Sequence, residues 1–111
     1  MQITAGHSSL HGAIDSGKIE TVRVVLEAGT SIDGQAEDGS TAVHFACTRG
    51  SLDMLKLMFS LQPEKKDSCL QMVDRNGMNP LHKAVMFDYS DIAEFLAQAS
   101  KFYSRIKSQL K

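Results

Sequence analysis

Residues 74–98 read DRNGMNPLHKAVMFDYSDIAEFLAQ and predict two short helices joined by a turn. Asn79 suits the start of the first helix, because its short side chain can accept hydrogen bonds from the free amides of the first turn. Pro80 follows at the first helical position, where its missing N–H costs nothing. Tyr89 lies in the break between the helices, and apolar residues recur at helical spacing on both sides of it. These apolar positions are Leu81, Ala84, Val85, Ile92, Ala93, Phe95 and Leu96. The stretch therefore predicts a helix-turn-helix unit that buries one apolar face.

Two further copies of this pattern precede it. Residues 40–46 read STAVHFA and residues 8–13 read SSLHGA, each with a histidine at the corresponding place. His44 follows His11 by 33 residues, and His82 follows His44 by 38. The motif Asn-Pro-Leu-His-x-Ala resembles the Thr-Pro-Leu-His-x-Ala signature of ankyrin repeats, whose period is about 33 residues. The resemblance implies an all-α ankyrin-repeat solenoid of three helix-turn-helix units, with an extended loop between the second and third.

The expected domain is residues 1–99, with units at about 6–37, 38–73 and 74–99. Ser8 should cap the first helix, and second helices are expected at about 19–28 and 52–61, the former ending at Gly29. Pro63 should end the latter helix. Within the inserted residues 62–73 we expect an extra helical turn at about 64–70, packed back onto the second unit. Residues 100–111 match no ankyrin pattern, and they are either a basic helical tail or a non-native terminus.

Length and composition limit the class of protein. A chain of 111 residues with 42% hydrophobic and 23% charged residues fits one globular domain. The net charge of −1 gives no reason to expect nucleic acid as a partner, although residues 101–111 carry +4 and leave −5 on the rest.

Cys47 is expected in a helix core and Cys69 in a loop, so no disulfide framework is predicted and a reducing cytosolic setting fits. No apolar run reaches about 18 residues, and no signal peptide is visible.

The repeated histidines could suggest a metal site, but the spacing expected between stacked repeats argues against one. Ligands of one zinc ion must all lie about 2.1 Å from it, whereas equivalent positions on stacked repeats are about 8–10 Å apart. We therefore expect His11, His44 and His82 each to bond to its own turn and to the neighbouring repeat. No phosphate-binding glycine loop or nucleophile with an orienting base is visible. The sequence predicts no metal, cofactor, small-molecule substrate or enzymatic activity.

Several departures from the general ankyrin pattern look similar to the cytosolic ankyrin array of invertebrate transient receptor potential ankyrin (TRPA) cation channels. They lie at residues 55–59, 61–63, 69–70, 79–82 and 86–88. This resemblance implies that the parent is a tetrameric, calcium-permeable membrane channel that responds to noxious chemicals or temperature. The chain would then be part of the N-terminal cytosolic region. The electrophile-reacting cysteines of that family match no position here, so Cys47 and Cys69 inherit no sensing role.

Two functions remain open from the sequence. The chain is a regulatory ankyrin segment of a TRPA-type channel, or it is a small soluble ankyrin adaptor that binds a protein through its finger loops and inner helices. The partner would be another protein or neighbouring ankyrin repeats of the same chain. Candidate contact residues lie at the finger loops and the inserted segment: Gln35, Glu37, Asp38, Glu64, Lys65, Lys66, Arg75 and Asn76.

Overall fold

The computed structural model describes residues 9–99, so the expected Ser8 cap and the predicted tail at 100–111 lie outside the described residues. Within residues 9–99 every regular element is helical. The elements are α1 (Ser9–Ser16), α2 (Ile19–Glu27), α3 (Ala42–Arg49), α4 (Leu52–Leu61), the 3-10 helix η1 (Pro63–Lys65), α5 (Lys66–Gln71), α6 (Pro80–Met86) and α7 (Ser90–Ala99). The predicted all-α solenoid of three helix-turn-helix units is confirmed.

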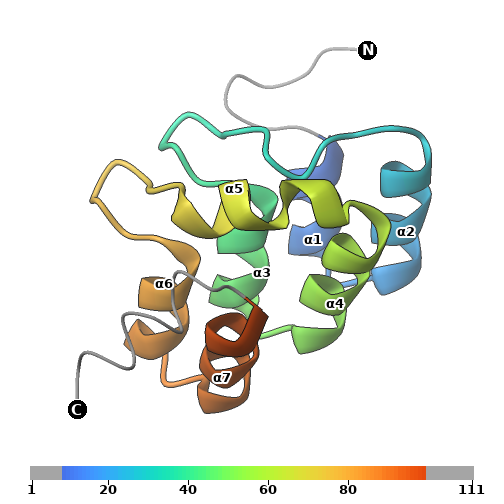
Figure 1. Cartoon of the computed structure of the whole chain (residues 1–111). Coiled ribbons are helices and arrows are strands. Elements are labelled where there is room, and N and C mark those ends of the chain that lie inside the picture. Colours follow the sequence, from blue (N-terminus) through green and yellow to red (C-terminus); the bar gives the residue numbers. More distant parts are fainter. Residues whose placement is uncertain (1–8, 100–111) are drawn as a thin grey trace.

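The helices form two layers (Figure 1). The first helices of the three units, α1, α3 and α6, pack in series, and α2 packs against α4 in the second layer. The loops that enter α3 and α6 project beyond the helices at one end of the molecule. This arrangement places those loops beside the exposed side of the first layer.

The first helices of the second and third units begin with the same capping arrangement. The side chains of Thr41 and Asn79 accept from the backbone N–H groups of His44 and His82, three residues on. Each histidine side chain in turn accepts from the N–H of its capping residue. These reciprocal bonds satisfy two amides that a helix start otherwise leaves free.

The apolar faces merge into one core that runs through the stack. Leu10, Ile14, Leu55 and Leu96 are at most 1% exposed. Phe59 of α4 and Phe95 of α7 extend this core between the last two units, with ring centroids 6.1 Å apart. One assignment was wrong: Val85, placed on the buried face from its spacing, is 65% exposed.

The inserted segment folds as helix, as expected for its central residues. It forms η1 and α5 in place of an extended loop, and it is in contact with the third unit as well as the second, because η1 packs on α4 and α5 packs on α6. Cys69 lies in α5 and is fully buried, so its placement in a loop was wrong. Cys69 and Leu70 are the buried residues of this six-residue helix, and both belong to the shared core.

Candidate protein-interaction surface

The loops entering α3 and α6 end in two equivalent hairpins, which we call the first finger (residues 36–40) and the second finger (residues 74–78). The N–H of Ala36 donates to the carbonyl of Ser40 over 2.8 Å, and the N–H of Asp74 donates to the carbonyl of Met78 over 3.0 Å. Gly39 and Gly77 sit at the same turn position with φ values of 85° and 75°. Glycine adopts this left-handed conformation without the cost that a Cβ atom adds. The two fingers therefore share one backbone shape.

The fingers are joined to each other at their tips. The backbone N–H of Arg75 donates to the carbonyl of Asp38 over 2.7 Å. Its guanidinium Nη2 donates to the carbonyl of Glu37 over 3.1 Å. Gly39 also lies tightly against the second finger, because a Cβ atom placed there would be 3.2 Å from the Cα of Asp74. The fingers thus form one continuous edge.

A histidine fixes the base of each finger. The Nε2 atom of His11 lies 3.3 Å from the carbonyl oxygen of Ser40, and that of His44 lies 2.9 Å from the carbonyl oxygen of Met78. The Nδ1 atom of His44 accepts from the backbone N–H of Thr41 over 3.0 Å, so Nε2 carries the proton that it donates to Met78. This confirms that His11 and His44 bond to the neighbouring unit.

Burial lowers the pKa of His44, although the hydrogen bond to the Met78 carbonyl partly opposes that shift. The direction agrees with the geometry, because Nδ1 can accept from Thr41 only in the neutral ring. His44 therefore holds the two units together in its uncharged form.

Asp74 organises the second finger from inside. Its carboxylate accepts from the backbone N–H groups of Asn76 and Met78 over 2.9 and 3.1 Å. Its other oxygen pairs with Lys83 Nζ at 3.1 Å. Burial alone would raise the pKa of Asp74, but the donors at Met78, Lys83 and Asn76 hold it below its ordinary value. The carboxylate is thus a structural part of the finger.

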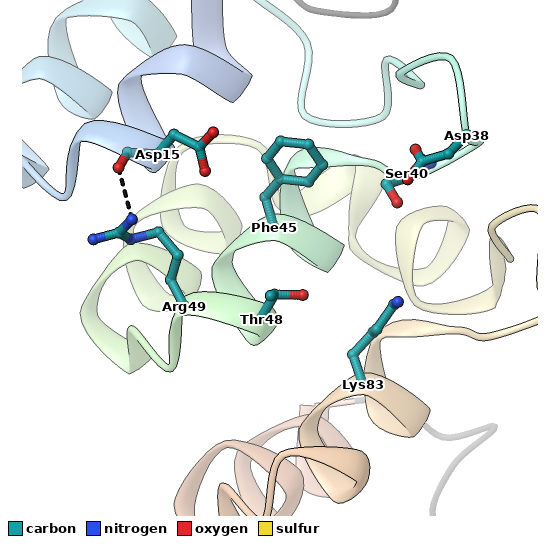
Figure 2. A pocket seen from close by; sticks show the side chains of 7 residues that line it. All are labelled: Asp15, Asp38, Ser40, Phe45, Thr48, Arg49 and Lys83. Carbon is teal, nitrogen blue, oxygen red and sulfur yellow. Dashed lines mark hydrogen bonds between the residues drawn. The ribbon is translucent and has the colours of Figure 1, made fainter.

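A groove of about 300 Å³ lies between the fingers and the first layer of helices (Figure 2). It is lined by Asp15, Asp38, Ser40, Phe45, Thr48, Arg49 and Lys83. Arg49 crosses from α3 toward α1, where its Nη1 donates to the carbonyl of Asp15 over 2.7 Å. Phe45 contacts the His11 ring edge-on, with centroids 4.7 Å apart. The groove therefore offers an aromatic floor with charges of both signs at its rim.

The contact residues named from the sequence fall into two groups. Gln35, Glu37, Asp38, Arg75 and Asn76 lie on or next to the fingers, and all five are exposed. Glu64, Lys65 and Lys66 lie on η1 and α5, apart from the fingers. Lys65 pairs with Asp33 at 3.4 Å, an interaction that ties the insert to the loop before the first finger. The structure brings the first group together, and the role of all eight in binding stays a prediction.

Most of the residues that line the groove were not predicted from the sequence. Of the seven, only Asp38 is among the predicted contact residues. The repeat register could have found Phe45, because it occupies the variable position between the histidine and the alanine of the signature. The signal for Lys83 is the same, since it follows His82 as Phe45 follows His44.

The described residues offer little for covalent chemistry. Burial raises the pKa values of the Cys47 and Cys69 thiols to about 12, which keeps them in the unreactive protonated form. Among residues 9–99 no group of three or more histidine, cysteine or acidic side chains could hold a metal ion. No helix in the same span has the length and apolar content to cross a bilayer.

Comparison with known proteins agrees with this geometry. A family profile described as ankyrin repeats, in three copies, matches residues 10–107. The chain belongs to the ankyrin-repeat family. Its members typically act as protein-interaction modules built from stacked hairpins.

The chain is also similar to individual proteins that contain ankyrin repeats or act as regulatory subunits. It is 45% identical over 91 residues to the transient receptor potential cation channel subfamily A member 1 of Drosophila melanogaster, an alignment that covers 82% of this chain and 8% of the channel. It is 29% identical over 103 residues to the mouse protein fem-1 homolog A-like, covering 91% of this chain and 14% of that protein. It is 33% identical over 61 residues to mouse protein phosphatase 1 regulatory subunit 27, covering 55% of this chain and 40% of the subunit. The chain thus spans less than half of the length of each of these three relatives.

Proposed function

We propose that this chain is a regulatory segment of the cytosolic ankyrin region of a TRPA-type, calcium-permeable cation channel. The observation that carries the proposal is the 45% identity to the Drosophila channel over 82% of the chain. The departures from the general ankyrin pattern at the insert and at the turn of the third unit support it. In this function the chain lies in the cytosol and its parent is a homotetramer in the plasma membrane.

The segment acts by mechanical continuity between its repeats. Each finger is bonded to the unit before it, as His44 bonds to Met78, and the fingers are bonded to each other through Arg75. A protein or a neighbouring repeat that binds the fingers and groove therefore pulls on several units at once. Such a stack couples contacts in the cytosol to the opening of a distant pore.

A chimeric channel tests this role. The matching segment of the Drosophila channel is replaced by residues 9–99 of this chain, and stimulated currents are recorded together with surface expression. We expect gating to be retained. In a second chimera, His44→Ala loosens the connection between two units and should shift the stimulus–response curve at unchanged surface expression. A chimera that reaches the surface but does not open would contradict the proposal.

The parent transcript gives an independent test. A continuous reading frame with six hydrophobic spans downstream supports the channel. A stop codon directly after Lys111 would rule out the channel proposal and favour the adaptor.

The adaptor is the alternative function, and the match to the phosphatase regulatory subunit favours it. In that case the fingers and insert form the binding surface of a soluble protein. Glu37→Arg and Glu64→Arg change exposed side chains of the first finger and of η1. Both should weaken capture of the partner while the melting temperature stays the same. Glu20→Arg on α2, also exposed and far from the fingers in sequence, serves as the control.

A further inference from the structure

Although the buried thiols are unreactive, the second finger carries two neighbouring residues that can react with each other. Asn76 precedes Gly77 at the tip of this finger. The backbone nitrogen that follows an asparagine can attack the side-chain amide carbon and close a five-membered imide. Glycine favours this attack because it has no Cβ atom to crowd the approach. The other asparagine of the chain, Asn79, precedes Pro80, which has no N–H and excludes the same reaction.

The side chain of Asn76 is open to water, but the nitrogen that must attack it is held in the hairpin. Asn76 and Gly77 are both exposed. The N–H of Gly77 donates to the carbonyl of Asp74 over 2.9 Å. The N–H of Asn76 donates to the carboxylate of Asp74, also over 2.9 Å. The attacking nitrogen must lose the proton that it donates to Asp74, so the reaction requires the finger to open.

The first finger shows that an aspartate fits this turn. Asp38 occupies the position that Asn76 has in the second finger, and each precedes a glycine with a positive φ, 85° in the first finger and 75° in the second. The carboxylate of Asp38 accepts from the N–H of Ser40 over 3.0 Å. An α-linked aspartate at position 76 therefore keeps the backbone of the finger and adds one exposed charge beside Arg75.

A β-linked aspartate at position 76 cannot keep the same bonds. Its main chain runs through the former side chain and gains one methylene group, which falls between two bonds that hold the finger in place. Before it, the N–H of Arg75 donates to the carbonyl of Asp38 over 2.7 Å. Around it, the N–H of Asp74 donates to the carbonyl of Met78 over 3.0 Å. An extra atom changes the spacing of these groups, so the link between the fingers opens.

We propose that Asn76–Gly77 is a covalent modification site at which the chain converts its own asparagine to an aspartyl residue, at a rate controlled by opening of the second finger. The nitrogen of Gly77 loses its proton and bonds to Cγ of Asn76, and the side-chain nitrogen leaves as ammonia. Water then opens the imide. Cleavage of the new Cγ–N bond gives the α-linked aspartate, and cleavage of the original peptide bond gives the β-linked one. Either product has gained one water and lost one ammonia, so no oxidant or cofactor is required.

The modification changes the edge that the two fingers form. The α-linked product places a negative charge next to Arg75, whose guanidinium donates to the carbonyl of Glu37 over 3.1 Å. The β-linked product separates the fingers and frees an α-carboxylate, the group that isoaspartyl methyltransferases esterify. The inference does not depend on whether the parent is a channel, because every reacting atom belongs to the second finger or to water.

Ageing of the purified chain tests the site. The chain is incubated at pH 8 and digested at low pH, and mass spectrometry follows the mass gain that exchange of an amide for a carboxylate causes. We expect conversion at Asn76 and not at Asn79 over the same period. A peptide of residues 71–82 has the same local sequence without the hairpin and gives the rate of the open form. Conversion in the folded chain should be at least about tenfold slower than in this peptide.

Two alanine variants test control by the finger. A Cβ atom on Gly39 would lie 3.2 Å from the Cα of Asp74, so Gly39→Ala pushes the fingers apart while the sequence around Asn76 stays the same. It should speed conversion at least about threefold. Gly29→Ala also strains a left-handed position, with a φ of 104°, but lies outside the fingers and should leave the rate unchanged. Equal acceleration by both variants would mean that global unfolding admits the reaction, which would overturn control by the finger.

The products test the effect on the fingers. Amide hydrogen exchange at Arg75 reports its bond to Asp38. We expect exchange in Asn76→Asp, which reproduces the α-linked product, to stay within about twofold of the unmodified chain. In the β-linked product, identified by esterification with an isoaspartyl methyltransferase, exchange should be at least about tenfold faster.

Three results would contradict the proposal. An Asn76 that converts no faster than Asn79 would overturn the site. A folded chain that reacts as fast as the peptide would overturn protection by the hairpin. A β-linked product that keeps the protection of Arg75 would overturn the predicted separation of the fingers.

Discussion

His44 and Met78 are 34 residues apart in sequence, and the Nε2 atom of the histidine lies 2.9 Å from the carbonyl oxygen of the methionine. This bond joins the helix of one repeat to the finger of the next. The other ring nitrogen is bonded within its own repeat, at the N–H of Thr41. One buried side chain thus serves both local capping and the stacking of units.

His44→Ala should lower the free energy of unfolding by about 3 kcal/mol, because it leaves a buried amide at Thr41 and a partly buried carbonyl at Met78 without this partner. The measurement is urea unfolding followed by circular dichroism. His82→Ala is the matched control, since that ring caps its helix but is exposed. It should cost less than about 1 kcal/mol. Equal losses of unfolding free energy in the two variants would mean that the bond between repeats contributes no stability beyond that of helix capping.

The pH dependence of stability should report the same ring. Burial holds the pKa of His44 below the 6.5 of an unfolded histidine. The unfolded chain therefore binds the proton first as the pH falls, and the native state loses stability. The contribution of His44 is complete above pH 6.5 and declines below it, until the lower native pKa is passed. Melting temperatures between pH 8 and 5 should show this fall, and His44→Gln should reduce it.

The hydrogen-bonded carboxylates act in a different range. The pKa values of Asp33, Asp38 and Asp74 lie below 3.8 in the folded protein. Their contribution is therefore lost only as the pH falls below about 4. A fall near neutral pH that persists unchanged in His44→Gln would contradict the assignment to His44.

Gly50→Ala should be among the most damaging single-methyl changes in the chain. The residue has a φ of 76°, and the added Cβ would lie 2.7 Å from the ring of Tyr89. We expect a loss of about 2–4 kcal/mol from backbone strain together with displacement of the ring. Gly29→Ala provides the comparison, because its φ is 104° but nothing lies within 4 Å of the new Cβ. It should cost about 1–2 kcal/mol, the backbone term alone.

Gln62 fixes the insert and α4 to the loop before the first finger. Its Oε1 accepts from the N–H of Ile32 over 3.0 Å, and its Nε2 donates to the carbonyl of Thr30 over 2.7 Å. Gln62→Ala should lower the free energy of unfolding by about 1–3 kcal/mol, because both backbone groups are partly buried. Gln71→Ala changes an exposed glutamine at the end of α5 and should stay within about 0.5 kcal/mol. Equal effects of the two changes would show that water replaces the Gln62 bonds.

The fold could be predicted from the sequence because its signals are local and repeated. Asn79, Pro80 and the spacing of the histidines each depend on residues within one turn or one period. Val85 was misplaced because its spacing reports only that a face is apolar, and burial of that face depends on whether another unit covers it. Gln62 and Cys69 were missed for a related reason, since their roles depend on contacts between the insert and distant loops.

The candidate binding surface was predicted only in part. The finger tips follow from the turn residues around Asp38 and Asn76, which sequence rules identify. The groove requires knowing that Arg49 reaches α1 and that Lys83 pairs with Asp74, and both interactions arise from stacking. Periodicity predicts that repeats stack, but it does not predict which side chains line the space between them.

Thiol labelling should separate the stability of the insert from that of the stack. Burial raises the pKa values of Cys47 and Cys69 to about 12, so at pH 8 only about one thiol in ten thousand is ionised even before access is considered. Cys47 lies in α3, between α1 and α6, whereas Cys69 lies in the six-residue helix α5. A short helix at the edge of a core opens locally at lower cost than a central one. With excess disulfide reagent, Cys69 should therefore react at least about tenfold faster than Cys47 in the native protein.

In 6 M guanidinium the two thiols should react at the same rate, which controls for intrinsic reactivity. Cys69→Ser and Cys47→Ser single variants allow each rate to be measured alone. Gln62→Ala should speed Cys69 and leave Cys47 unchanged, because it releases the insert and not the stacked helices. Equal native rates, or a Gln62 effect of the same size on both thiols, would mean that the insert and the repeats open as one cooperative unit.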